Sequence, residues 1–477
     1  MAGSAVDGVL AGSLCEEGAV SLEGRGIEPI PESARYGSLA RVFTVWFTPN
    51  LTLSAFFIGS LATADFLRLG FGTALLAIIV GNLLGGLLVG ALAAMGPATG
   101  MGQIPFARLP FGKGIVLPGL LNWISTIGWD GINSLFGAGA LVLLVGAPFP
   151  LALLLIVGCQ GALGILGYEA IHLFERWLAP ALGGLFVVLT VAIAGQADVT
   201  RVDGFSGLDD LGAFVLMVSI VVSYMLGWAL YASDYTRYLP ASTSARAVGV
   251  ATAASLIVST SWIEILGLLV ADQLRDSTVS GVDRLLGGGV VGAIALVAIA
   301  VGTVASNALN DYTGSLSLQA AGVRVPRALA AAIVAVLGFL FTLYLNAGSF
   351  ASEYENYLLF LSYWIAPAAG VILADWWLRG RTADPRDLVT FSRLSGGLPA
   401  LAALAAGFLV SLPFQASSIG ADIAASTGLP VNAISAGPLH GADLGYLVGL
   451  AVAVAVYLGA WRLAPGSRSA SPMAPRS

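Results

Sequence analysis

The sequence predicts an all-α integral membrane protein with twelve transmembrane helices. Only 10% of the 477 residues are charged, whereas 57% are hydrophobic and the mean hydropathy is +0.89. An ordinary soluble protein carries about 25% charged residues, so a soluble globular domain is excluded. The high apolar content and the net charge of only -6 also exclude a disordered chain. A spanning helix needs about 20 apolar residues, so the spans can be counted as charge-poor runs.

These runs follow one another along the chain. The first, 42–64, has no charged residue, and neither has the second, 69–107, which is long enough for one span and a Gly/Pro-rich segment. The turn Gly146-Ala147-Pro148 divides 114–168 into the third and fourth spans. The remaining expected spans are 177–197, 211–233, 247–271, 285–310, 328–352, 356–374, 394–421 and 444–461.

The second span contains two consecutive pairs of glycines, each with a spacing of four residues. These pairs are Gly81 with Gly85, and Gly86 with Gly90. This spacing lets a neighbouring helix backbone approach closely. We therefore expect these glycines to serve helix packing and not substrate binding.

Basic residues are distributed unevenly between the two sides of the predicted membrane. With a cytoplasmic N-terminus, 17 of the 21 lysines and arginines fall in inner segments and 4 in outer loops. This asymmetry follows the positive-inside rule and predicts a multi-pass plasma membrane protein with both termini in the cytoplasm. The N-terminal segment has no apolar core of a signal peptide, so the first span is expected to be retained. The sequence pI near 5.0 and the absence of a basic block argue against binding to nucleic acid.

The first span is interrupted by Pro49 and Asn50, followed by the hydroxyls of Thr52 and Ser54. Proline removes a hydrogen bond from the helix, and such a break persists in a membrane only where protein or water satisfies the freed groups. Two interpretations remain open at this point: a simple proline kink, or a discontinuous helix that lines a binding site.

Trp129 and Asn133 lie four residues apart in the third span, hence on one helix face. An aromatic plane beside an amide suits a flat heterocycle with hydrogen-bonding edges. The alternative is a tryptophan in the core with an asparagine that bonds a neighbouring helix.

Carboxylates inside predicted spans indicate function, because hydrocarbon penalises them. Asp130, Glu264 and Asp311 are such residues, and each is a candidate carrier of a proton or, alternatively, a neutral acid bonded locally. Asp234 and Arg237, three residues apart at the end of the sixth span, are expected to pair at the inner membrane face.

The remaining reactive residue types predict no further chemistry. Cys15 and Cys159 are far apart and predict no disulfide, and the two histidines are too few for a metal site or a catalytic constellation. We therefore expect neither an enzyme nor a metal or other cofactor.

Several segments carry a resemblance to a known family. The segment 26–38 is followed by Trp46-x-x-x-Asn50-x-x-x-Ser54, and later by Gly128-Trp129-x-x-x-Asn133-Ser, Gly227-Trp228, Ser233-Asp-Tyr-Thr-Arg-Tyr238 and Ser306-Asn307-x-x-Asn310-x-Tyr312. In order and spacing these resemble the purine–cytosine permeases of the nucleobase:cation symporter-1 family. The resemblance covers about residues 26–395.

The resemblance implies a LeuT-like fold, with two five-helix repeats of inverted topology and two additional C-terminal helices. The corresponding segments are 1–38 (cytoplasmic), 39–200 (first repeat), 205–380 (second repeat), 394–463 (extra helices) and 464–477 (cytoplasmic tail). The implied site lies where the first and sixth helices unwind, against the third and eighth.

The resemblance also implies roles for individual residues. Trp129 and Trp228 would hold a base between them, and Asn133 and the first-span hydroxyl of Ser54 would contact it. On the eighth span Asn310 matches the family amide, with Asn307 as the rival alignment.

This sequence departs from the family at two places that concern the coupling ion. Asp130 stands where relatives usually have an uncharged residue, and the paired hydroxyls of sodium-coupled members are reduced to Ala305-Ser306. Thr303 and Ser306 are the hydroxyls that remain, so protons are favoured over sodium.

The expected function is import of cytosine and/or a purine by proton symport with alternating access. A symporter of allantoin, a hydantoin, or a thiamine- or pyridoxine-like vitamin is the alternative. A channel is disfavoured, because it needs a continuous polar pore and the polar residues cluster at one level. A membrane enzyme is disfavoured, because the two histidines lie near the ends of spans and form no catalytic constellation. The expected partners are the small substrate and the lipid bilayer, with no obligate protein partner.

Overall fold

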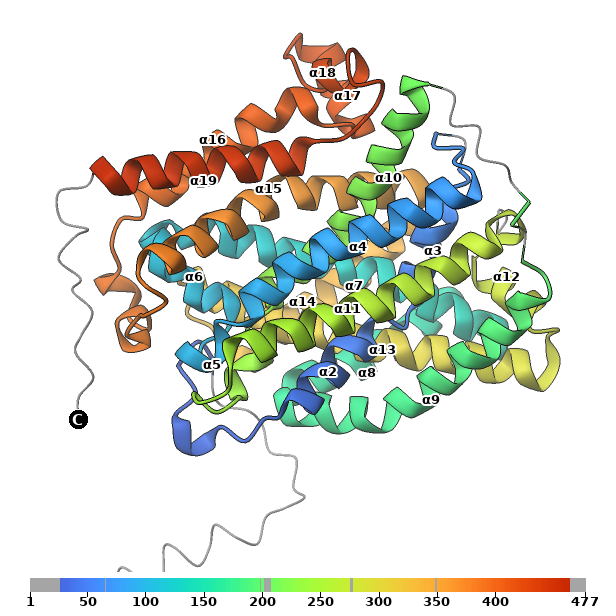
Figure 1. Ribbon diagram of the computed structural model, residues 1–477. Coiled ribbons are helices and arrows are strands. Elements are labelled where there is room, and N and C mark those ends of the chain that lie inside the picture. The colour runs from blue at the N-terminus through green and yellow to red at the C-terminus, as the bar shows by residue number, and fades with distance from the viewer. Residues whose placement is uncertain are drawn as a thin grey trace, which may run out of the picture.

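The computed structural model describes residues 26–463, apart from 65, 198, 201–206, 275–277 and 348–349. Within these residues the regular structure is entirely helical (Figure 1), as the sequence predicted. Ten described helices are long and apolar enough to cross a membrane, and two bent pairs of shorter helices raise the number to twelve. Most of the expected N-terminal segment 1–38 and the whole tail 464–477 lie outside the described residues.

The α-helices are α2 (Leu39–Phe47), α3 (Leu53–Leu61), α4 (Phe71–Ala93), α5 (Gly96–Thr99), α6 (Gln103–Phe111), α7 (Val116–Val145), α8 (Phe149–Leu166), α9 (Tyr168–Ala194), α10 (Leu208–Leu226), α11 (Ala245–Leu269), α12 (Thr278–Leu285), α13 (Gly289–Ala320), α14 (Arg327–Leu345), α15 (Phe350–Leu378), α16 (Leu398–Ser411), α17 (Ser418–Thr427), α18 (Ala433–Ala436) and α19 (Gly445–Leu463). Short 3-10 turns that matter below are η2 (Thr48–Asn50), η4 (Ala229–Tyr231) and η5 (Thr236–Tyr238).

The first span is a discontinuous helix. Its halves α2 and α3 are bent by 60° at the η2 turn, which contains Pro49. The side chain of Asn50 donates to the Trp46 carbonyl at 2.7 Å, and Thr52 caps α3 by accepting from the Ala55 amide. Side chains thus replace hydrogen bonds that the proline break removes, and the discontinuous interpretation is correct.

The sixth span is interrupted as well. Helix α10 ends at Leu226, and the chain continues through η4 and η5 instead of a continuous α-helix. The expected span 211–233 therefore loses its regular helix at Gly227, immediately before Trp228. The first and sixth spans unwind in the middle of the molecule, as the resemblance implied.

Two long helices, α7 and α13, pack along each other through the centre of the bundle. Helix α4 packs on α10 and α11, and its glycines explain how. A Cβ on Gly81 or Gly85 would lie 2.6 or 2.3 Å from a side chain of α10, and one on Gly90 would lie 2.5 Å from the Gly249 carbonyl of α11. The predicted packing role of this glycine pattern is confirmed, with a separate partner helix for each pair.

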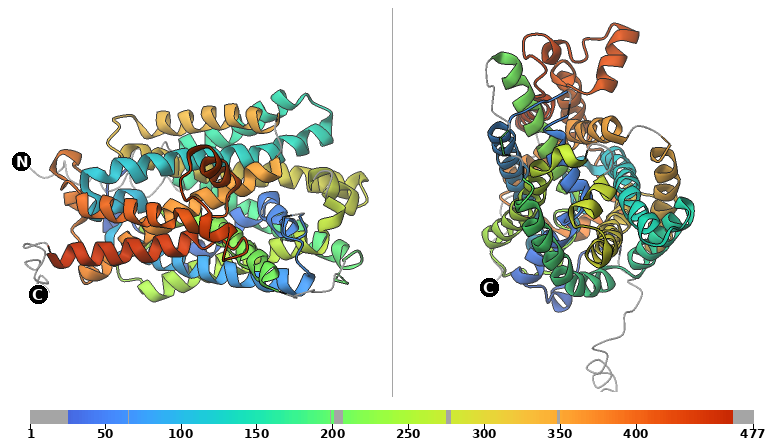
Figure 2. Two further views of the ribbon diagram at one scale, coloured as in Figure 1. Left: turned by 90° about the horizontal axis from the view of Figure 1, so that it is seen from above. Right: turned by 90° about the vertical axis from the view of Figure 1, so that its right-hand side faces the viewer.

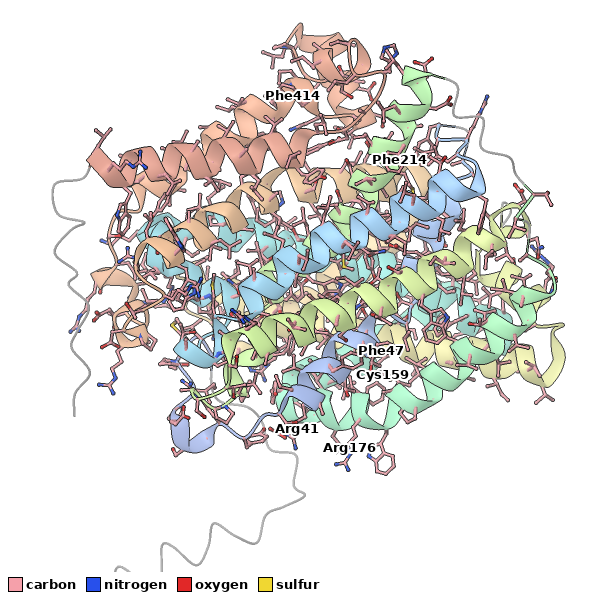
Figure 3. All side chains as sticks on the ribbon, viewed as in Figure 1. Arg41, Phe47, Cys159, Arg176, Phe214 and Phe414 are labelled. Atoms are coloured by element: carbon pink, nitrogen blue, oxygen red, sulfur yellow. The ribbon has the colours of Figure 1, made fainter. Side chains whose placement is uncertain are left out.

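The C-terminal helices lie at one edge of the bundle. Helices α16 and α19 pack against each other, and α19 also packs on α15 (Figures 1 and 2). Side chains fill the spaces between the helices (Figure 3), whereas large apolar side chains such as Leu87, Trp177 and Val290 point outward and are more than half exposed. Such a surface suits a surrounding bilayer.

Two expected spans need correction. The fifth begins at Tyr168 and not at 177, so Glu175, which is 1% exposed, lies within the helix and inside the protein. The predicted span began after Glu175 because it was defined as a run without charged residues. In the structure Glu175 is tolerated within the helix because other helices bury it. The expected eleventh span, 394–421, is a bent pair of helices: α16 with η9 (Leu412–Phe414) forms one arm, and α17 forms the other at an angle of 88°.

Candidate functional site

A cavity of about 260 Å³ lies where the first and sixth spans unwind, against α7 and α13. Its lining residues come from these four spans, and they are Ser54, Trp129, Asn133, Tyr224, Gly227, Trp228, Tyr231, Ser306 and Asn310. The fold thus brings together five of the six residues that the sequence predicted for substrate binding. The sixth, Asn307, is fully buried behind the wall.

The aromatic walls of the cavity are held by edge-to-face contacts. Trp129 of α7 meets Tyr224 with ring centroids 5.5 Å apart and an angle of 88° between the planes. Trp228 meets Tyr231 at 5.5 Å and 76°. This arrangement is the one that aromatic quadrupoles prefer, so it fixes the orientation of both indole rings.

The break in the first span also positions Trp228. Its indole nitrogen donates to Asn50 Oδ1 at 3.0 Å, and the Tyr224 hydroxyl donates to the same oxygen at 3.3 Å. On the other side of the break, the hydroxyls of Thr52 and Ser54 are 2.8 Å apart. One buried amide of the first span therefore connects two aromatic residues of the sixth.

The amides of the cavity wall are oriented by Asn307. Its Oδ1 accepts from Asn133 Nδ2 at 3.0 Å and from Asn310 Nδ2 at 3.2 Å. Its Nδ2 donates to Gln160 Oε1 of α8 at 2.8 Å. These bonds leave Asn133 Oδ1 buried and without a donor among the described residues. A buried acceptor of this kind suits a ligand that brings its own N–H group.

Asn310 forms part of the wall itself, and its Oδ1 accepts from the Tyr231 hydroxyl at 3.0 Å. Of the two rival asparagines on α13, Asn310 therefore faces the cavity, and Asn307 acts from behind it.

The two candidate hydroxyls of α13 are turned toward α7. Thr303 Oγ1 donates to the Asn133 carbonyl at 3.3 Å, and Ser306 Oγ accepts from Asn133 Nδ2 at 3.4 Å. Both hydroxyls thus take part in holding Asn133 in place.

The three intramembrane carboxylates occupy two separate places. Asp130 of α7 and Asp311 of α13 lie next to each other and are fully buried. Glu264 lies on α11, where its Oε2 accepts from Asn82 Nδ2 of α4 at 2.5 Å. The structure thus brings Asp130 and Asp311 together directly behind the cavity wall and keeps Glu264 apart from them.

Asp234 and Arg237 do not form the expected ion pair within the described part of the chain. The carboxylate of Asp234 accepts from the Gln103 amide and from Thr313 Oγ1, each at 2.7 Å, whereas Arg237 donates to the Tyr312 hydroxyl. The reason is that the chain runs through the irregular η5 turn here, so a helical spacing of three residues does not place the two side chains face to face. Next to Arg237, the ring of Tyr238 stacks on that of Tyr168 of α9, with ring centroids 3.6 Å apart.

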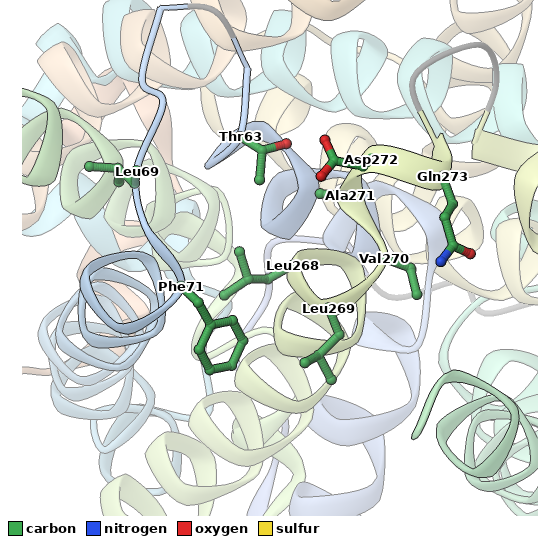
Figure 4. A pocket seen from close by; sticks show the side chains of 9 residues that line it. All are labelled: Thr63, Leu69, Phe71, Leu268, Leu269, Val270, Ala271, Asp272 and Gln273. Atoms are coloured by element: carbon green, nitrogen blue, oxygen red, sulfur yellow. The ribbon is translucent and has the colours of Figure 1, made fainter. Parts of the chain in front are cut away.

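A second cavity, of about 350 Å³, lies between the end of α3 and the end of α11 (Figure 4). Thr63, Phe71, Leu268 and Asp272 are among its lining residues. It contains none of the residues that the sequence predicted for a site, so the central cavity is the candidate site.

Sequence reasoning missed Asn50, Tyr224 and Tyr231 as members of the site. A signal was present for the two tyrosines, because Tyr224, Trp228 and Tyr231 have the spacing of one helix face. No signal in the sequence showed that Asn50 bonds both Tyr224 and Trp228, since this contact joins residues far apart in the chain.

The fold and the cavity define a multi-pass membrane transporter, because the discontinuous helices meet around a binding site in the middle of the bundle. Residues 29–449 match a family model described as permease for cytosine/purines, uracil, thiamine, allantoin. The match spans most of the chain, and the protein belongs to this family.

Curated relatives are permeases and not enzymes. The purine-cytosine permease fcyB of Emericella nidulans is 29% identical, and the match covers 75% of this chain and 73% of the relative. The purine-cytosine permease FCY21 of Saccharomyces cerevisiae is 27% identical, with 92% of this chain and 86% of the relative covered. The cytosine permease of Escherichia coli K12 is 26% identical, with 80% and 86% covered.

Solved structures show the same fold. The nucleobase-cation-symport-1 family transporter Mhp1, in a closed conformation with bromovinylhydantoin bound, superimposes with a TM-score of 0.73 over 93% of this chain and 96% of Mhp1, at 19% identity. Its inward-facing conformation gives a TM-score of 0.67 at 18% identity. The LeuT-like architecture of two inverted repeats with two further helices is thereby shown.

Proposed function

We propose that the protein imports a nucleobase, cytosine and/or a purine, by proton symport with alternating access. The observation that carries this proposal is the central cavity, whose lining brings together two tryptophans and two oriented amides. Aromatic faces together with amide groups suit a flat ring system with hydrogen-bonding edges.

The chemistry of the walls supports a base. A neutral base loses its hydrogen bonds to water when it enters, and stacking on an aromatic side chain returns about 1–3 kcal/mol per base. Asn133 Oδ1 is left without a donor among the described residues, so it would accept from an N–H or amino group of the base. We assign Asn310 to the same base edge and Ser54 to the opposite side of the cavity.

The hydrogen bonds made by the two hydroxyls of α13 favour coupling to protons over coupling to sodium. A sodium site in this fold uses backbone carbonyls of the broken first helix together with hydroxyls of the eighth. Thr303 and Ser306 are instead engaged with Asn133 of α7. Carboxylates near the cavity provide proton sites that need no such cage of oxygens.

The proposed setting is the plasma membrane with both termini in the cytoplasm, because inner segments hold 17 of the 21 basic residues. The expected partners remain the base and the lipid bilayer.

The experiment is uptake of labelled cytosine by cells or proteoliposomes that contain the protein, in competition with unlabelled compounds. The panel contains cytosine, adenine, guanine, hypoxanthine and uracil, and also allantoin, a hydantoin, thiamine and pyridoxine. Competition by cytosine or a purine at the lowest concentration supports the proposal. Stronger competition by allantoin, a hydantoin or a vitamin would replace the nucleobase by that heterocycle.

A further inference from the structure

Asp130 and Asp311 face each other between the two central helices. Each is fully buried, and the carboxyl of Asp130 lies within hydrogen-bonding reach of the carboxyl of Asp311. Glycines of two other helices make room for them. A Cβ on Gly338 of α14 would lie 2.7 Å from Asp130 Cβ, and one on Gly164 of α8 would lie 2.5 Å from Asp311 Cβ. The pair is thus enclosed by α7, α8, α13 and α14.

The side chain of Asn310 also lies within hydrogen-bonding reach of Asp130. No donor of the described residues, however, makes a hydrogen bond of good geometry to any of the four carboxyl oxygens. Among the enclosing helices, α14 carries the charged group Arg327, which donates to the Gly164 carbonyl at 2.7 Å and lies over the ring of Tyr312. The other titratable groups that interact electrostatically with Asp130 are the phenols of Tyr231 and Tyr357. None of these groups makes an ion pair with either carboxylate.

Two buried like charges at contact distance, without a compensating cation, are too costly to persist. Carboxyls in this position share protons instead, because the O–H of one satisfies an oxygen of the other. The fully protonated pair is neutral and is therefore the form that an occluded, water-free site favours. A pair with one negative charge becomes tolerable when water reaches it.

Each acid is the chain neighbour of a residue on the cavity wall. Asp130 follows Trp129 on α7, and Asp311 follows Asn310 on α13. Successive residues of a helix are about 100° apart. Trp129 and Asn310 therefore face the cavity, whereas the acid that follows each of them points toward the other acid.

Asn307 connects the cavity and the acid pair by a second route. Its Nδ2 lies 3.1 Å from the Asp130 carbonyl, and its Oδ1 receives the amides of Asn133 and Asn310. A ligand that repositions these amides therefore acts on the backbone that carries the acids.

We propose that Asp130 and Asp311 form one shared carboxyl pair that binds the coupling proton. This inference rests on the proposed function and names the site of its ion. The pair takes up one proton from the outer water, crosses as a neutral pair together with the bound substrate, and releases that proton to the inner water. One negative charge then remains on the pair while the empty carrier returns with water in the vacant cavity, and a proton from the outer water neutralises it before the next substrate crosses.

The test compares exchange with accumulation in proteoliposomes. Asp130→Asn and Asp311→Asn should each retain counterflow of labelled cytosine, which needs no net proton movement, and lose accumulation driven by a pH gradient. The double variant D130N/D311N preserves the shape of the neutral pair and serves where a single variant does not fold. Glu175→Gln is the matched control, because it removes another fully buried carboxyl, on α9, and should keep accumulation.

Infrared difference spectroscopy on the purified protein gives a readout that does not depend on transport. The wild type should show the carbonyl stretch of protonated carboxyls at neutral pH, and part of this signal should vanish in both single variants. A separate part should vanish in Glu175→Gln.

The outcomes separate the two proposals. If the wild type accumulates cytosine and both single variants accumulate it equally well, the acid pair is not the proton site, although the proposed function stands. If the wild type transports no base at all, the proposed function fails, and the spectrum alone decides on the pair. The inference would then be overturned if both single variants kept the full signal of protonated carboxyls.

Discussion

Trp129 and Trp228 line the same cavity from α7 and from the unwound part of the sixth span. We expect Trp129→Ala and Trp228→Ala each to lose one stacking face, worth about 1–3 kcal/mol, and hence to weaken apparent affinity by about 5- to 150-fold. Trp→Phe should retain part of the affinity. The measurement is the concentration dependence of uptake, corrected for protein in the membrane.

A matched control for these variants is Trp377→Ala on α15, because Trp377 is 65% exposed and does not line the cavity. Its affinity should stay at the wild-type value. Unchanged affinity in both cavity variants would contradict the role of the tryptophans in binding.

Asn133 is expected to determine which compound is preferred. Its Nδ2 is held by Asn307, so Oδ1 is the atom available to a ligand. Asn133→Gln moves this acceptor along the base edge, and a site that hydrogen-bonds a polar edge discriminates strongly between analogues. We therefore expect a changed order of competitors in the uptake assay.

The control for this change is Asn122→Gln on the same helix, because Asn122 bonds Ser317 Oγ of α13 at 2.8 Å and does not line the cavity. It should leave the order of competitors as it is. Uniform weakening of all competitors in Asn133→Gln would assign this amide a structural role instead.

At the scale of residues, the sequence predicted the members of the site better than their connections. Trp129 and Asn133 share a helix face by spacing alone, and the resemblance supplied Trp228 and Asn310. The contact between Asp130 and Asp311 was not predictable, because it depends on how α7 and α13 are rotated against each other. The expected pair of Asp234 and Arg237 was wrong for the opposite reason, since local spacing assumed a regular helix where the chain unwinds.

The contact between α3 and α11 is the closest approach of two backbones around the broken first span. A Cβ on Gly59 would lie 1.7 Å from the Glu264 carbonyl, and one on Gly267 would lie 1.8 Å from the Phe56 carbonyl. Gly59→Ala therefore forces the helices apart, and overpacking of this kind costs about 1–3 kcal/mol or more. We expect a lower melting temperature of the purified protein and reduced uptake.

Gly184→Ala on α9 is the control, because a Cβ there meets no atom within 4 Å. It should leave both melting temperature and uptake unchanged. A Gly59→Ala protein with the wild-type melting temperature would contradict this prediction. It would show that the first span can move away from α11 without loss of stability.

At the scale of elements, charge-poor runs located the spans but not their ends. Pro49 indicated either a kink or a break in the first span, and the structure shows a break. The charge-poor runs could not predict that α9 starts at Tyr168, because Glu175 is tolerated through burial among other helices. They also could not distinguish the bent pair α16 and α17 from one straight span, because both have the same apolar composition.

At the scale of the whole molecule, the uneven distribution of arginines predicts the orientation. The loop before α11 contains Ser242, and the turn after α14 contains Asn346; both are exposed. In a background without Cys15 and Cys159, an impermeant thiol reagent applied to intact cells should label Asn346→Cys and leave Ser242→Cys unlabelled until the cells are opened. The reversed labelling pattern would invert the proposed topology.

The coupling ion is a property of the complete transport cycle. The hydroxyls of Thr303 and Ser306 are engaged with Asn133, whereas two carboxyls lie behind the cavity, so we expect protons and not sodium to drive uptake. Uptake of labelled cytosine into energised vesicles should persist when choline replaces sodium, and it should collapse on addition of a protonophore. A neutral substrate that enters with one proton also carries one positive charge inward, so an inside-negative potential should increase uptake at constant pH. Uptake that requires sodium and is indifferent to the protonophore would assign the coupling to sodium, and Asp130 and Asp311 would then be structural acids.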